Sequence, residues 1–562
     1  MSTHRLRASA ALFVLLGSAA LWAASPTGAW SLVDIPNPNL QDQNALALGG
    51  VSCASRSDCW AVGSVTVSLS PQPLLEHWNG SAWQLGTFIT PGADSALGGV
   101  DCTSANACWA VGGYVGAGVL VARWNGTAWV TEPTPVIDTV HAGSNNRGSL
   151  GGVHCVSASD CWAVGAYLDA NSIQRTLAEH WNGVTWSIVA TPVPATDASH
   201  QNYLQRVTCL SASDCWAVGG YEEPTAPVLQ PHTLLEHWNG AAWSIAASPN
   251  VPDIVSPGSQ TYVSSVLTGI SCISSANCWA AGYSDPNGVD ELDTLFEHWD
   301  GTRWTIVAAP ETSAPNNYFT DVTCVSASLC WAVGGFENVT ADQTMIARWD
   351  GVTWTIVPTP NQPSSGAELE DNFLHAVTCA SASDCWTVGE FSSVKYDFGP
   401  YQPLALRFIS PNLPPIANAG ADFAVNENSA ANLHGAGTDP DAGDALTYQW
   451  QQLRASGDPA VTLAGADQAD ANFTAPAVSA DRVLNFRLTV TDSSGAPASD
   501  DVAVTVRNTD PASGGGPVPS TAATDPIGNN YLGGGSGALP LSTLLLGFLL
   551  SLVRRRTHAS TR

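Results

Sequence analysis

The sequence has almost no lysine and few basic residues of any kind. Lys395 is the only lysine, and 19 lysines and arginines stand against 48 aspartates and glutamates, for a formal net charge of −29. Nucleic-acid binding needs clustered basic side chains that contact phosphates, so we expect no nucleic-acid partner. The acidity is consistent with solubility, with calcium binding or with a salty habitat.

Familiar catalytic motifs are also missing. The chain has no Gly-x-Ser-x-Gly string in a triad context, no P-loop and no His-Glu-x-x-His pair. The Asp boxes of sialidases and the full signatures of kelch and WD repeats do not occur either. The sequence therefore predicts no particular reaction.

Long apolar runs occur only at the two ends. Arg5 and Arg7 precede an apolar stretch from about Ala8 to Ala24, and small residues follow. This pattern predicts a secretory signal peptide over residues 1–29, cut between about Ala20 and Ala29. No cysteine lies near the cut, which excludes a lipoprotein anchor. We therefore expect a protein that uses the export machinery.

The other end has a glycine-rich box, a short apolar segment over 538–553 and a basic tail over 554–562. Sixteen residues are short for a membrane-spanning helix, which needs about 20. A plain membrane anchor is one interpretation. The layout resembles a GlyGly-CTERM bacterial sorting signal. That resemblance implies a transient inner-membrane helix, cleavage by an intramembrane protease of the rhomboid type, and release to the cell surface or medium. The expected cleavage region is Gly533, Gly534, Gly535, Ser536 and Gly537.

All 14 cysteines belong to seven copies of one string, of which "CVSASDCWAVG" at Cys155 is typical. Zinc sites prefer closer cysteines with further ligands, and redox pairs are separated by two residues. In an exported chain, this spacing around a β-turn predicts one disulfide in each copy, worth about 2 kcal/mol. The pairs are Cys53 with Cys59, Cys102 with Cys108, Cys155 with Cys161, Cys209 with Cys215, Cys272 with Cys278, Cys324 with Cys330, and Cys379 with Cys385.

The copies recur about every 50 residues, and each unit except the last contains four strand signals. An Asn-Gly or Asp-Gly turn joins the third strand to the fourth. Such units are blades of a β-propeller. The last unit ends at Leu404–Phe408 without a fourth strand, whereas an orphan fourth strand begins at Trp30. Pairing of these two segments predicts a closed, seven-bladed propeller over 30–410, within an all-β protein.

Tryptophans recur at fixed positions in every unit, which favours a role in packing between blades over a glycan-binding surface. The Glu-His strings that begin at Glu76, Glu179, Glu236 and Glu297 carry arginine in other units, and we interpret them as packing residues as well. On the first strands, Asp101 and His154 lie on adjacent blades. They could form an acid–base pair, but we expect a hydrated channel wall.

The sequence pattern changes over 413–508, which contains no cysteine and has strand-like segments of alternating apolar and polar residues. The stretch from Pro414 to Trp450, with "NFTAPAV" and "LNFRLTVTD" after it, resembles PKD domains, which implies an immunoglobulin-like β-sandwich used as spacer or adhesion module, sometimes with calcium. Asp439, Asp441 and Asp444 in "DPDAGD" are candidate calcium ligands. Ala442 departs from the family's usual string, and turn chemistry alone also explains these aspartates. Residues 509–537 predict a flexible linker.

Loops between second and third strands, and between blades, vary most in length, and all of them lie on one face of the predicted propeller. Binding sites usually lie on variable loops of a rigid scaffold. We therefore favour a surface or secreted binding protein for a glycan or an extracellular protein. An extracellular polysaccharide hydrolase or lyase is the first alternative, with Glu222, Glu223, Asp290 and Glu291 as candidate carboxylates. A purely structural envelope protein is the second.

Overall fold

The computed structural model describes residues 28–509, except 39–45, 68–69, 88–93, 115–117, 138–147, 195–199, 223–230, 252–253, 257–258, 262–263, 286–290, 339–340, 363–370, 393–400, 440 and 442–443. Residues 1–27 of the predicted signal peptide and the whole predicted sorting tail lie outside the described residues. Within the described ranges all regular elements are strands, so the all-β prediction is confirmed, and no helix there is long and apolar enough to cross a membrane.

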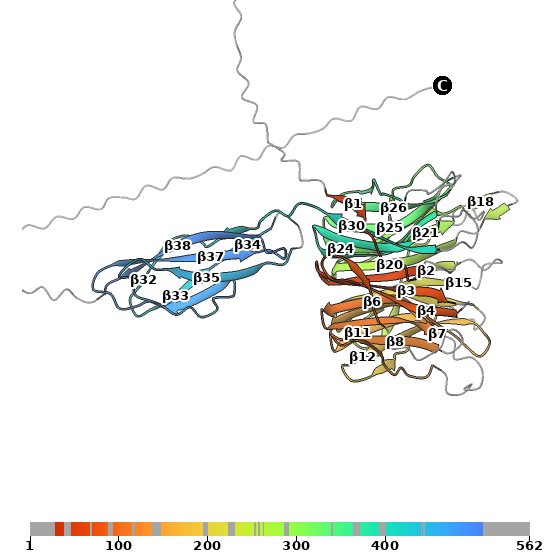
Figure 1. Ribbon diagram of the computed structural model, residues 1–562, viewed down its shortest axis with the longest axis horizontal. Helices are drawn as coiled ribbons and strands as arrows, with labels where there is room; N and C mark the ends of the chain where they lie inside the picture. Colours follow the sequence, from red (N-terminus) through yellow and green to blue (C-terminus); the bar gives the residue numbers. More distant parts are fainter. Residues whose placement is uncertain are drawn as a thin grey trace, which may run out of the picture. The chain divides into compact units, whose positions relative to one another are not determined.

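Seven four-stranded antiparallel sheets follow the repeats (Figure 1). We call them blades 1 to 7. Blade 1 contains β2 (Leu46–Ser55), β3 (Asp58–Val67), β4 (Ser70–Trp78) and β5 (Trp83–Leu85), and blade 2 contains β6 (Ser95–Ser104), β7 (Ala107–Tyr114), β8 (Gly118–Trp124) and β9 (Trp129–Thr131). Blade 3 contains β10 (Gly148–Ser157), β11 (Asp160–Leu168), β12 (Gln174–Trp181) and β13 (Trp186–Ile188). Blade 4 contains β14 (Asn202–Ser211), β15 (Asp214–Glu222), β16 (Pro231–Trp238) and β17 (Trp243–Ala246).

The remaining blades continue the pattern after a small hairpin of β18 (Ile254–Ser256) and β19 (Ser259–Thr261). Blade 5 contains β20 (Ser264–Ser274), β21 (Asn277–Asp285), β22 (Asp293–Trp299) and β23 (Trp304–Val307). Blade 6 contains β24 (Asn316–Ser326), β25 (Leu329–Glu337), β26 (Asp342–Trp349) and β27 (Trp354–Val357). Blade 7 contains β28 (Asp371–Ser381), β29 (Asp384–Ser392), β30 (Tyr401–Ile409) and, as its fourth strand, β1 (Ala29–Leu32).

The two ends of the propeller meet in blade 7, as the sequence predicts. Strand β1 pairs antiparallel with β30, and Trp30 lies opposite Phe408. Each first strand also contacts the first strand of the next blade, and β28 of blade 7 contacts β2 of blade 1. The sheets therefore close into a ring, and pairing with β1 covers the edge that β30 would otherwise expose.

The disulfides staple the hairpin between the first and second strands of each blade. All seven pairs of adjacent cysteines are bonded, and the paired cysteines lie directly opposite each other in the ladder, as Cys155 and Cys161 do. At the same end of blades 1 to 6, an Asn-Gly or Asp-Gly turn joins the third and fourth strands, and its glycine adopts positive φ, for example 91° at Gly183. We call this end of the propeller the disulfide face and the opposite end the loop face.

Tryptophan side chains fill the space between neighbouring blades. Trp162 of blade 3 packs edge-on against Trp243 of blade 4, with ring centroids 5.1 Å apart, and it also contacts Trp238. The same triplet recurs around the ring, where Phe408 takes the place of the third-strand tryptophan in blade 7. The tryptophans are therefore core residues.

The glutamate and histidine of the third strands also pack within the ring. The ring of His180 packs in a tilted arrangement against Trp162 of its own blade, and Nε2 hydrogen-bonds to the carboxylate of Asp160 at 2.7 Å. Where arginine replaces histidine, as at Arg123, its guanidinium lies over the corresponding tryptophan. The interpretation of these strings as packing residues is consistent with these contacts.

A network of charged side chains joins blade 1 to blade 7. Asp384, with a side chain only 1% exposed, accepts hydrogen bonds from Arg407 at 2.6 and 2.8 Å and from Arg56 Nε at 3.2 Å. Arg56 also donates to the hydroxyl of Ser383. We call these residues the seam network, because they tie the first repeat to the last.

The C-terminal part is a β-sandwich with its own core (Figure 1). Its largest sheet has the order β32-β38-β37-β35, beside the pairs β31-β34 and β33-β36. Trp450, Phe486 and Leu488 are buried at its centre. The strands are β31 (Ile416–Asn418), β32 (Phe423–Asn426), β33 (Ala430–His434), β34 (Ala436–Thr438), β35 (Thr447–Leu453), β36 (Asp470–Thr474), β37 (Arg482–Thr491) and β38 (Pro497–Arg507).

Candidate functional site

The first strands surround a cavity of about 320 Å³ that is lined by residues of all seven blades. One position on these strands, just after a bulge, is glycine or alanine in five blades because neighbouring strands approach closely there. A Cβ added to Gly99 would lie 3.1 Å from the Cα of Gly152. The five small residues are Gly50, Gly99, Gly152, Gly269 and Ala376.

Arg206 and Asp321 occupy this position in the other two blades. The guanidinium of Arg206 donates to the carbonyl of Gly151 at 2.6 Å and to the carbonyl of Gly49, in blade 1, at 3.1 Å. It therefore reaches across the lumen from blade 4. Burial raises the pKa of Asp321, while the positive charge of Arg206 and the backbone N–H groups of Val377 and Val322 oppose that shift.

The pair Asp101 and His154 does not form a hydrogen-bonded dyad in the described structure. Asp101 accepts hydrogen bonds from the hydroxyl of Ser52 and from the backbone N–H of Cys155, in the next blade. Ser271 likewise accepts from the N–H of Cys324. These polar residues tie adjacent first strands together. Nδ1 of His154 is buried and has no hydrogen-bond partner within the part of the chain that the structure describes.

The loop end of the first strands differs between blades. Tyr203 and Tyr318 sit where blades 1 to 3 carry Ala47, Ala96 and Ser149. Burial, followed by electrostatic repulsion from Tyr283 and Glu222, raises the pKa of Tyr203 to about 12. Because Ser149 is small, an open groove of about 360 Å³ remains between blades 3 and 4. Its lining includes Ser149, Gln174, Tyr203, Gln205 and Arg206. We call it the blade 3–4 groove.

The candidate catalytic carboxylates do not come together among the described residues. Glu222 accepts hydrogen bonds from the backbone and side-chain nitrogens of Gln201. Glu291 is an exposed residue that precedes β22, whereas Glu223 and Asp290 lie outside the described residues. No acid–base pair is therefore formed by the predicted set within the described ranges.

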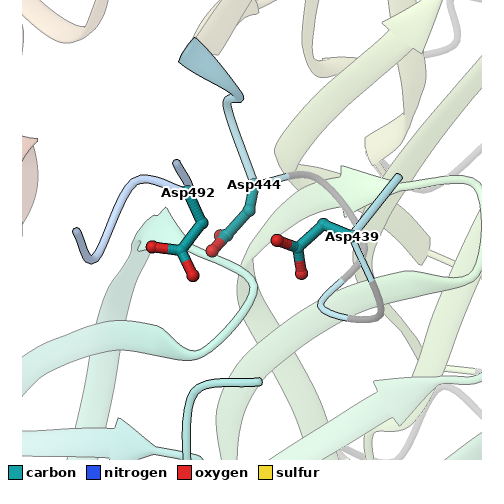
Figure 2. Close-up of side chains that lie close together, drawn as sticks. All are labelled: Asp439, Asp444 and Asp492. Atoms are coloured by element: carbon teal, nitrogen blue, oxygen red, sulfur yellow. The ribbon is translucent and has the colours of Figure 1, made fainter. Parts of the chain in front are cut away.

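In the sandwich, three carboxyl groups converge, and Figure 2 shows them pointing toward one another. Asp439, Asp444 and Asp492 each offer an oxygen within 4.8 Å of the others. Burial, followed by the neighbouring carboxylates, raises the pKa of Asp444. Asp441, the third residue of the predicted set, lies outside this triad, because its carboxylate accepts a hydrogen bond from the backbone N–H of Leu413.

The chemistry of this triad fits a hard cation. Oδ2 of Asp439, both carboxylate oxygens of Asp444 and Oδ1 of Asn412 are buried without a hydrogen-bond partner in the described structure. The Asn412 side chain reaches the same place, since its amide donates to Asp492 at 2.7 Å. Calcium prefers several carboxylate and amide oxygens, which this set supplies. Asp492 was missed from the sequence because it is distant from the "DPDAGD" loop.

Comparison with known proteins assigns this second module. A family model for PKD domains matches residues 419–506. Residues 419–506 form a PKD domain. The solution structure of the PKD domain from KIAA 1837 protein is 24% identical, with a TM-score of 0.14, and the match covers 17% of this chain and 92% of that one.

The propeller has similar solved structures as well. A structure of YCF48 with a bound peptide is 13% identical with a TM-score of 0.42, over 68% of this chain and 97% of that one. The Aleuria aurantia lectin in complex with Fucalpha1-6GlcNAc is 13% identical with a TM-score of 0.36, over 59% of this chain and all of that one. No match was found among curated proteins.

Proposed function

We propose that this chain is an exported, non-catalytic binding protein of the bacterial cell surface or medium. In this proposal its seven-bladed propeller holds a glycan or an extracellular protein on the loop face, and the PKD domain acts as a spacer. The blade 3–4 groove carries the proposal, because its lining combines Tyr203 with the polar residues Gln174 and Gln205. A lining that combines a tyrosine with amide-bearing residues suits an amphipathic ligand such as a sugar. The stapled blades hold these side chains in place.

A glycan array and a pull-down with the full chain test this proposal. We expect Tyr203→Ala to weaken binding about ten-fold, as truncation of a central aromatic contact usually does. Tyr318→Ala is the matched control, because Tyr318 has the same place in its blade but does not line the groove. Binding that is absent in the intact chain, or that both variants weaken equally, would contradict the groove as the site.

We also propose that the PKD domain binds calcium through Asp439, Asp444 and Asp492, with the side chain of Asn412 as a further oxygen donor. Calcium sites of extracellular modules have Kd values of about 0.1–1 mM. At about 100 times Kd, calcium should raise the unfolding free energy of the domain by about 2.7 kcal/mol. The measurement is denaturant unfolding in calcium and in EDTA at equal ionic strength.

Asp444→Asn should abolish this stabilisation. Asp501→Asn is the control, since Asp501 is exposed and pairs with Arg487 away from the triad. Equal unfolding free energies of the unaltered chain with calcium and with EDTA would rule out the site.

A further inference from the structure

The channel cavity is a second concave site, at the opposite end of the ring from the loop face. Along the channel, the cavity extends from the level of Arg206 and Asp321 toward the disulfide turns. Its lining includes the first cysteines of blades 4 to 6, which lie next to those turns. On the loop side, the guanidinium of Arg206 bridges the carbonyls of Gly151 and Gly49. A volume of about 320 Å³ is at the lower limit for small-ligand pockets and accommodates one ring-sized molecule.

The charges in the wall determine which ligand class it accepts. Arg206 and Asp321 offset each other, and Asp101 adds a negative charge that its hydrogen bonds to Ser52 and Cys155 hold in place. An anion would meet like charge at two carboxylates there, and a cation would meet like charge at the guanidinium of Arg206. A neutral ligand avoids both penalties.

Beside valines and Ile270, the lining includes hydrogen-bonding side chains at one level of the ring. The hydroxyls of Thr208, Thr323 and Thr378 come from three different blades, and each can donate and accept. His154 adds the buried Nδ1 atom that has no partner within the described residues. Groups that can act in both roles suit the hydroxyls of a polyol, which need partners of both kinds.

We propose that the channel cavity binds a single neutral, polyhydroxylated ring, such as a hexose, which enters from the disulfide face. The site is separate from the blade 3–4 groove, and Arg206 is the residue that lines both. Within the described residues, the channel cavity contains no residue of the variable loops. Sugar binding there is therefore independent of the function proposed for the loop face.

Saturation-transfer NMR and calorimetry with the full chain test this site. The probes are glucose, galactose, mannose and fucose as neutral sugars, with galacturonate as the anion and glucosamine as the cation. We expect at least one neutral sugar to bind more tightly than both charged probes. Loss of one hydroxyl contact in Thr323→Val should weaken binding about five-fold. His154→Phe, which removes both ring nitrogens from the wall, should weaken binding about five-fold as well.

Thr355→Val is the control and should bind as the unaltered chain does, because Thr355 is an exposed residue of β27. Unfolding midpoints of all variants are measured in parallel, and Thr323→Val decides the outcome if His154→Phe does not fold. The proposal is overturned if no neutral sugar binds, if galacturonate or glucosamine binds more tightly, or if Thr323→Val leaves the affinity unchanged.

Discussion

The propeller is expected to lose stability steeply as the pH rises from about 5 to about 8. Four third-strand glutamates are completely buried, and burial raises the pKa of Glu236 to about 8 and that of Glu179 to about 7. Burial likewise raises the pKa of Glu76 and that of Glu297 to about 8. The carboxylates of Glu76, Glu179 and Glu236 have no hydrogen-bond partner in the described structure. Below these pKa values the folded state therefore holds the four groups in their neutral form.

The sign of the effect follows from proton binding. Between the unfolded pKa of 4.5 and a folded pKa of about 8, the folded chain binds more protons than the unfolded one at Glu236. Stability is then greatest below pH 4.5 for this group and falls by up to about 1.4 kcal/mol for each pH unit above it. Hydrogen bonds from Thr302 and Arg303 lower the pKa of the exposed Asp300 to about 2. Its titration therefore affects stability only at pH values below about 4, outside the range in which the glutamates titrate.

Glu236→Gln provides the matched test, because glutamine has the shape of the neutral acid. We expect it to change the unfolding free energy by less than about 1 kcal/mol at pH 5 and to raise it by about 2–4 kcal/mol at pH 8. Denaturant titrations at both pH values measure the difference. A pH slope that is the same in the variant and in the unaltered chain would show that Glu236 is not held neutral.

Asp384→Asn is expected to destabilise the propeller by about 3–5 kcal/mol, because it leaves two arginines of the seam network without their buried counter-charge. Arg407 also lies over the rings of Trp78 and Trp386, so its position affects the packing between blades 1 and 7. The measurement is the free energy of unfolding in denaturant.

Asp214→Asn is a control at the same place in blade 4. Asp214 pairs with His237, and its side chain is 24% exposed against 1% for Asp384. A half-exposed pair contributes about 0–1 kcal/mol, so this variant should be close to the unaltered chain. If the two variants are equally destabilised, the seam network has no special part in closing the ring.

Much of the fold could be predicted because the information is local and repeated. The Asn-Gly turns, the cysteine spacing and the recurrent tryptophans each act within one or two neighbouring units. Pairing of Trp30 with Phe408 is long-range, but counting strands at both ends was sufficient to predict it.

The sites were harder to predict because they depend on departures from the repeat. Arg206 and Asp321 interrupt a column of glycine and alanine, so aligning the first strands would have revealed them, although not that Arg206 reaches Gly49 across the ring. Asp492 joins Asp439 and Asp444 only through the folding of the sandwich. No local pattern contains that contact.

The placement of the disulfides has a consequence for the order of assembly. Each cysteine finds its partner within its own hairpin, six positions along the chain, so every bond can form as soon as that hairpin emerges. Mispairing with another repeat requires a much larger loop to close, which is entropically disfavoured. Strand β1, by contrast, must wait for β30, so the first strand synthesised is among the last to find its place.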